Sequence, residues 1–168
     1  MGIFRVAPIL CCPHTRRMPT ASIITQFGPL CVTEEDEAIT QLSWRHAPRQ
    51  DETPLLRLTL DQLAAYDTGR LDVFDLPLRV AGTDFQRAVC AAMSAIPLGE
   101  TRTYGDIAKA LGAMPQAVGQ ACGANPIPVI IPCHRVMGAK GLTGFSGAGG
   151  VETKVALLRH EGAGGFLI

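Results

Sequence analysis

A cysteine and a histidine stand next to each other in the stretch VIIPCHRVMGAKGLTGFSG, residues 129–147. The thiolate is the reactive form of cysteine, and a free thiol with a pKa of about 8.5 is mostly protonated at neutral pH. A histidine that removes this proton, and is itself oriented by a third group, turns a cysteine into a nucleophile. Cys133 and His134 therefore predict nucleophilic chemistry. The alternative is a buried structural cysteine, because free cysteine is among the most buried residue types.

The chain on either side of this pair indicates how the pair is held. The run IPVII, residues 127–131, is β-branched and bounded by prolines, so it predicts a short strand that carries Cys133 to the rim of the core. Neighbouring side chains on a strand point to opposite faces, so contact between Cys133 and His134 requires a turn or a bridging water molecule. A carboxylate is the expected third group, and Glu161 in LLRHEG, at the end of the last helical pattern, is available.

The first half of the chain has the pattern of a small α/β domain. Residues 22–44 predict three strands separated by a Gly-Pro turn and an acidic turn, which is an antiparallel meander. Residues 53–69 place apolar side chains at helical spacing and end at a glycine. Residues 73–82 are extended and lead to a break near Gly82, where we expect the domain boundary.

The second half changes to a helical pattern. A helix begins at the N-cap Thr83 and ends before Pro97. Residues 104–111 and 115–123 predict two short helices joined by a tight turn, which is the helix-turn-helix arrangement. An ordinary helical hairpin is the alternative. The second of these helices is uncharged and rich in Ala and Gly, so it lacks the long side chains that read bases in the major groove and could bind DNA only through shape and backbone.

These patterns divide the chain into an N-terminal extension (residues 1–19), an N-terminal α/β domain (residues 20–82) and a C-terminal helix-turn-helix domain (residues 83–168). Positive and negative residues number 15 each, so the formal net charge is zero. Acidic residues prevail in the first half and the second half is mildly basic, which places any anionic partner on the second half.

Composition narrows the class of protein. Hydrophobic residues make up 47% of the chain, enough for a real core, but no apolar run approaches the roughly 20 residues that span a bilayer. The opening residues show no signal cleavage site, so we expect a cytoplasmic protein whose six cysteines are thiols. Cys11, Cys12 and His14 have metal-ligand residue types, but a four-ligand site needs further partners, so a loose tail without metal is the favoured interpretation.

Six motifs in order carry a resemblance to a known family. GTDFQ, IPLGETRTYGDIA, GANP, IPCHRV, LTGFSG and KVALLRHEG resemble the O6-alkylguanine-DNA alkyltransferase family over residues 82–162, and residues 20–80 resemble its N-terminal domain more loosely. The resemblance implies an α+β fold. A small N-terminal α/β domain with an antiparallel sheet would precede an α-rich winged helix-turn-helix domain that carries the active site.

The resemblance also implies a reaction. Cys133 would attack the alkyl carbon on guanine O6, and also on thymine O4, in DNA and keep the alkyl group as a thioether. A thioether has no carbonyl for water to attack, so each molecule acts once. His134 would deprotonate Cys133 through water, Glu161 would orient His134, and Asn125 would hold the network.

The partner implied by the family is alkylated double-stranded DNA, contacted in the minor groove with the target guanine flipped out of the stack. The protein would act as a monomer with no cofactor and no metal. Tyr104 would press on the target phosphate, and the backbone of Val136 and the Ser146 loop would hold the guanine edge. The residues expected to bind substrate or DNA are Tyr104, Gln116, Ala117, Gly119, Gln86, Val136, Phe145 and Ser146.

The sequence departs from the family pattern at several positions. Gln116 stands where the family inserts an arginine into the gap left by the flipped base, and the preceding turn is shorter. Phe145 replaces a tyrosine, Cys90 replaces a tryptophan, and the loop after Ser146 is longer. Two other classes remain as alternatives: a non-catalytic alkylguanine-binding relative, which lacks the cysteine, and a Cys-His hydrolase, which would turn over.

Overall fold

A computed structural model describes residues 17–142 and 144–163. The first part is a three-stranded antiparallel sheet in the order β1 (Thr20–Thr25), β2 (Gly28–Glu35) and β3 (Ala38–Trp44), so the predicted meander is confirmed. Asp36 and Glu37 both adopt positive φ in the β2–β3 turn. Positive φ at both central residues gives a turn whose twist matches that of the flanking strands.

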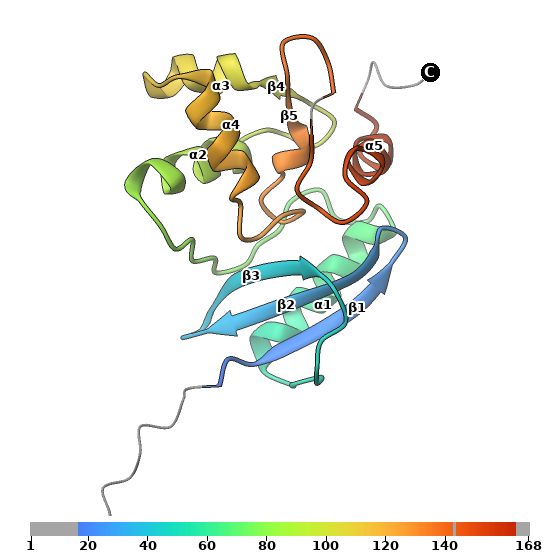
Figure 1. Cartoon of the computed structure of the whole chain (residues 1–168). Helices are drawn as coiled ribbons and strands as arrows, with labels where there is room; N and C mark the ends of the chain where they lie inside the picture. The colour runs from blue at the N-terminus through green and yellow to red at the C-terminus, as the bar shows by residue number, and fades with distance from the viewer. Residues whose placement is uncertain (1–16, 143, 164–168) are drawn as a thin grey trace, which may run out of the picture.

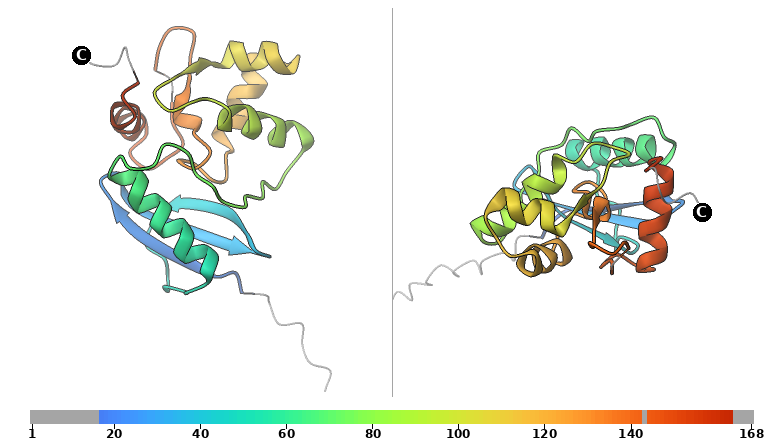
Figure 2. Two further views of the ribbon diagram at one scale, coloured as in Figure 1. Left: turned by 180° about the vertical axis from the view of Figure 1, so that it is seen from behind. Right: turned by 90° about the horizontal axis from the view of Figure 1, so that it is seen from above.

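Helix α1 (Pro54–Asp67) covers one face of the sheet (Figures 1 and 2). It begins where the Thr53 side chain accepts a hydrogen bond from the Leu56 amide, and proline occupies its first position. Leu56, Leu63 and Tyr66 are buried on the side that faces the sheet. Tyr66, in the last turn of the helix, also reaches the second part of the molecule, where its hydroxyl donates to Glu161.

The second part is helical. It consists of α2 (Asp84–Ser94), β4 (Arg102–Thr103), α3 (Tyr104–Leu111), α4 (Pro115–Gly123), a 3-10 turn η1 (Cys133–Arg135), β5 (Val136–Met137) and α5 (Val151–His160), with β4 and β5 paired in parallel. The predicted helices are all present. Gly112 ends α3 in the left-handed conformation, at φ 62°, which allows the tight turn into α4. No helix among the described residues is long and apolar enough to cross a membrane.

The predicted strand at residues 127–131 is wrong. This segment forms a turn in which the Ile131 amide donates to the Ile127 carbonyl at 2.9 Å and Val129 has a φ of 72°. Proline cannot donate to a strand ladder, and Pro128 lies inside the segment. The Asn125 side chain instead satisfies the Ile127 amide and the Ile131 carbonyl, at 3.0 and 2.8 Å.

The two parts share one hydrophobic core and are joined by backbone hydrogen bonds. The Leu42 amide of β3 donates to the Pro126 carbonyl at 2.9 Å, so the sheet is bonded directly to the segment that follows α4. The linker residue Leu78 pairs with Ile39 of the same strand. Figure 1 shows the result: β3 lies at the edge of the sheet that faces the helical part.

Candidate active site

Cys133 and His134 open the 3-10 turn η1, and both are buried. A 3-10 helix has three residues per turn, so neighbouring side chains diverge by about 120° instead of pointing to opposite faces. The 3-10 turn therefore supplies the turn that contact between the adjacent Cys133 and His134 requires. The prolines on both sides of residues 127–131 explain why the chain reaches Cys133 without forming a ladder.

Glu161 lies directly after α5 and is the acceptor for the surrounding side chains. Its Oε1 is 2.8 Å from His134 Nε2 and accepts from the Tyr66 hydroxyl at 2.8 Å, while Arg135 Nε donates to Oε2 at 2.8 Å. Burial alone would raise the pKa of Glu161, but the hydrogen bonds from His134 and Arg135 outweigh it and lower the pKa to about 2. Glu161 is therefore a carboxylate at neutral pH.

His134 is fully buried, and burial lowers its pKa more than the neighbouring Glu161 raises it. The ring is therefore neutral at neutral pH. Because Glu161 is ionised, we assign the proton of His134 to Nε2, which donates to the carboxylate. Nδ1 is then an acceptor, and it has no hydrogen-bond partner among the described residues. An acceptor nitrogen oriented by a carboxylate has the properties of a general base.

The Cys133 thiol is not activated by its surroundings alone. Burial raises its pKa, while a hydrogen bond with Asn125 and the charge of Lys154 act in the opposite direction. The thiol is therefore protonated at neutral pH in the resting site and requires a base. Asn125 also fixes the turn before Cys133 through its bonds at Ile127 and Ile131, which agrees with its expected role as holder of the network.

Three residues of the site were not among the predicted catalytic residues. Tyr66 reaches Glu161 from α1, across 95 positions of sequence. Arg135 pairs with Glu161 and also donates to the Ile96 carbonyl, so it holds the carboxylate in place. Lys154 is buried on α5 and donates to the Val136 carbonyl at 2.6 Å. A charged residue in the apolar stripe of KVALLRHEG was the available signal for Lys154.

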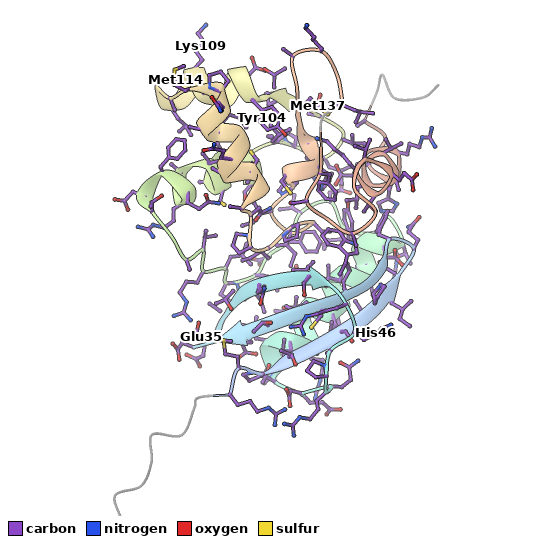
Figure 3. The ribbon with its side chains drawn as sticks, in the orientation of Figure 1. Glu35, His46, Tyr104, Lys109, Met114 and Met137 are labelled. Atoms are coloured by element: carbon purple, nitrogen blue, oxygen red, sulfur yellow. The ribbon has the colours of Figure 1, made fainter. Side chains whose placement is uncertain are left out.

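The expected DNA-binding residues fall into two groups. Tyr104 begins α3 and packs beside Gly119 of α4, where a Cβ would lie 4.0 Å from its ring (Figure 3). Gln116 is exposed and Ala117 partly buried in the first turn of α4. Gln86, by contrast, turns inward and donates to the Ala121 carbonyl at 2.9 Å.

The second group lies nearer the nucleophile. Val136 is buried, and Phe145 and Ser146 lie in the loop before α5. Ser146 and Asn125 line a cavity of about 350 Å³, together with β3 residues of the sheet. The structure therefore brings Cys133, His134, Asn125 and Glu161 into one cluster and places the Ser146 loop beside it.

The described residues contain no group of His, Cys, Asp and Glu that could hold a metal ion. Four cysteines within the described ranges, Cys31, Cys90, Cys122 and Cys133, are free thiols. The CCxH cluster at residues 11–14 lies outside the described residues.

Comparison with known proteins places this chain in a family. The family model for "6-O-methylguanine DNA methyltransferase, DNA binding domain" matches residues 84–163. A methylated-DNA–protein-cysteine methyltransferase of Methanosarcina acetivorans is 41% identical over 148 residues, which is 82% of this chain and 94% of the relative.

Solved structures agree with these relatives. The crystal structure of Mycobacterium tuberculosis O6-methylguanine methyltransferase has a TM-score of 0.75 at 41% identity, covering 88% of this chain and 94% of that chain. The structure of M. tuberculosis OGT in complex with DNA has a TM-score of 0.74 at 42% identity, covering 86% and 92%.

Fold and site together define a DNA-binding protein with a buried Cys-His-Glu site. The chain belongs to the O6-methylguanine-DNA methyltransferase family, whose curated relatives are named methylated-DNA–protein-cysteine methyltransferases. The family and the α+β fold class predicted from the sequence are confirmed. The match to a DNA-binding domain includes α3 and α4, which favours the helix-turn-helix interpretation over a simple hairpin.

Proposed function

We propose that this protein repairs DNA by transferring the methyl group of O6-methylguanine to Cys133, once per molecule. The observation that supports this most is the arrangement of His134. Its Nε2 is bound to the Glu161 carboxylate, and Nδ1 is left as an acceptor on the residue that follows the cysteine. Cys133, His134 and Glu161 are all buried, and the proposed base directly follows the proposed nucleophile in the sequence.

In the proposed reaction, Nδ1 of His134 takes the Cys133 proton through a bridging water molecule. The sulfur electron pair forms a bond to the methyl carbon while the bond from carbon to guanine O6 breaks, leaving its electron pair on the base. The base takes up a proton and is restored to guanine. Because the product is a thioether, water cannot release the methyl group and the cysteine is not regenerated.

We further propose that α4 enters the minor groove of double-stranded DNA and that the target guanine is flipped out to reach Cys133. The small residues Ala117 and Gly119 allow close approach of the helix, and Gln116 occupies the position next to the gap. O4-alkylthymine would react in the same way. The protein would work as a cytoplasmic monomer, with its N-terminal domain ending near Gly82.

The test is to incubate the protein with duplex DNA that contains one O6-methylguanine and to map adducts by mass spectrometry. The wild type should gain one methyl group, on Cys133, and Cys133→Ser should gain none while still binding DNA. Cys122→Ala is the matched control, because Cys122 is another buried thiol of the same part of the fold. Repaired DNA in excess of protein would indicate a hydrolase, and binding without an adduct would indicate a non-catalytic relative.

A further inference from the structure

We propose that Trp44, at the end of β3 in the N-terminal sheet, is a positioning residue for the reaction. It holds the loop that carries Phe145 and Ser146 against the substrate and thereby sets which O6-alkyl groups fit. This inference rests on the function proposed above. It assigns to the sheet a part in substrate selection, whereas the expected site residues all belong to the helical part.

The N-terminal sheet fixes the orientation of the Trp44 ring. Its indole Nε1 donates to the Phe27 carbonyl in the β1–β2 turn at 3.1 Å, so the orientation of the ring is set by the sheet. Two residues earlier on the same strand, the Leu42 amide donates to the Pro126 carbonyl at 2.9 Å. Pro126 follows Asn125, whose side chain donates to the Ile131 carbonyl, two residues before Cys133. The position of Trp44 is therefore tied to the nucleophile through one strand.

Trp44 also fixes the loop. Its ring meets the Phe145 ring edge to face, with centroids 5.7 Å apart and an interplanar angle of 83°. At Gly147 the backbone runs so close that a Cβ would lie 2.8 Å from the Trp44 ring. Ser146 lies between these two contacts. Because the described residues from Leu142 to Gly150 form no helix or strand, the aromatic contact is a principal constraint on where Ser146 lies.

The cavity next to this contact is lined from both parts of the fold. It has a volume of about 350 Å³, and its lining includes Leu42, Ser43 and Trp44 of β3 together with Asn125, Pro128 and Ser146. A space lined by aromatic and aliphatic groups and by hydroxyl and amide groups suits a flat purine with an apolar substituent. Removal of the indole would therefore have two effects: it would widen the cavity, and it would release the loop that carries Ser146.

The test compares Trp44→Ala, Trp44→Phe and the control Leu60→Ala. Leu60 is a partly buried apolar residue of α1 that packs on the same core, away from the loop. Single-turnover transfer rates are measured with duplex O6-methylguanine and with free O6-benzylguanine, and thermal unfolding is measured for each variant. Adducts on Cys133 are mapped in every case.

For Trp44→Ala we expect methyl transfer to slow by about 10²-fold, the order of loss that small displacements of a positioned group cause. Benzyl transfer should fall less, since the widened cavity accepts the larger group, so the ratio of benzyl to methyl rates should rise by about tenfold. Trp44→Phe should recover most of the wild-type ratio. Leu60→Ala should lower the melting temperature and leave the ratio unchanged.

A Trp44→Ala protein whose rates and ratio match those of Leu60→Ala would overturn the inference. If Trp44→Ala does not fold, Trp44→Leu, which keeps apolar volume but lacks the ring and the N–H, takes its place with the same criterion. A wild type that transfers methyl groups to Cys133 while the variants show no change in ratio refutes the inference alone. A wild type that forms no adduct on Cys133 refutes the proposed function and the inference with it.

Discussion

Replacement of Glu161 by glutamine should weaken both the fold and the reaction. The folded-state pKa of Glu161 is about 2, against an ordinary value of 4.5. At roughly 1.4 kcal/mol for each pKa unit, this difference corresponds to about 3 kcal/mol in the free energy of unfolding. An independent figure agrees: removing one partner of a buried ion pair costs about 3–5 kcal/mol, and Glu161→Gln leaves buried Arg135 without its counter-charge.

The pH dependence has a definite sign. Because the folded-state pKa lies below the ordinary one, the stabilisation from Glu161 is fully present above pH 4.5 and is lost as the pH falls from 4.5 towards 2. The difference in unfolding free energy between wild type and Glu161→Gln should therefore be about 3 kcal/mol at neutral pH and shrink over that acidic range. Urea titrations at a series of pH values measure it.

The same variant should transfer methyl groups more slowly, because His134 loses the negatively charged acceptor that fixes its Nε2 proton, and the amide has one acceptor oxygen to share among His134, Arg135 and Tyr66. Loss of an oriented general base costs about 10²–10⁴-fold, measured here as the single-turnover rate on methylated duplex. Glu152→Gln, which changes an exposed glutamate near the start of α5, is the control. The reasoning is refuted if Glu161→Gln keeps the wild-type rate and pH profile, or if the stability difference persists unchanged at low pH.

Three further changes test other parts of the site. Tyr66→Phe removes one hydrogen bond to a charged acceptor and should lower the free energy of unfolding by about 1.5–3 kcal/mol in urea titrations, with a smaller effect on transfer because the His134 bond remains. Lys154→Met removes a positive charge that lowers the Cys133 pKa, so the pH profile of the transfer rate should move to higher pH; an unchanged profile contradicts this. Gln116→Arg adds charge and stacking beside the gap and should raise duplex affinity and repair rate without altering reaction with the free base. Slower duplex repair by Gln116→Arg would mean that this position does not enter the stack.

The sequence was informative where chemistry is local. Adjacent Cys133 and His134 predicted a nucleophile with a base, and the end of the last helical pattern supplied Glu161, which lies 2.8 Å from His134. The helices were predictable because their caps and apolar spacing are also local, as at Thr53 and Thr83. The roles of these residues in the reaction stay predictions until the adduct is mapped.

Sequence reasoning failed where contacts between distant segments determine the conformation or the partner of a residue. The β-branched residues at 127–131 favoured a strand, but proline and the Asn125 side chain impose a turn and leave Val129 at positive φ. Tyr66 was not predictable as a partner of Glu161, because nothing in either segment indicates that α1 ends beside α5. The contact of Trp44 with Phe145 joins distant segments in the same way.

The hydrogen bond between Tyr66 and Glu161 has a consequence for the order in which the molecule folds. The carboxylate comes from the segment after α5, and its donors come from α1 and η1, so its environment closes only when segments 95 positions apart have met. Contacts of such separation form late, because the loop between them must first lose entropy. A growing chain therefore lacks an assembled relay until Glu161 has been synthesised. Until then His134 has no fixed acceptor, and the Cys133 of an unfinished chain is an ordinary thiol.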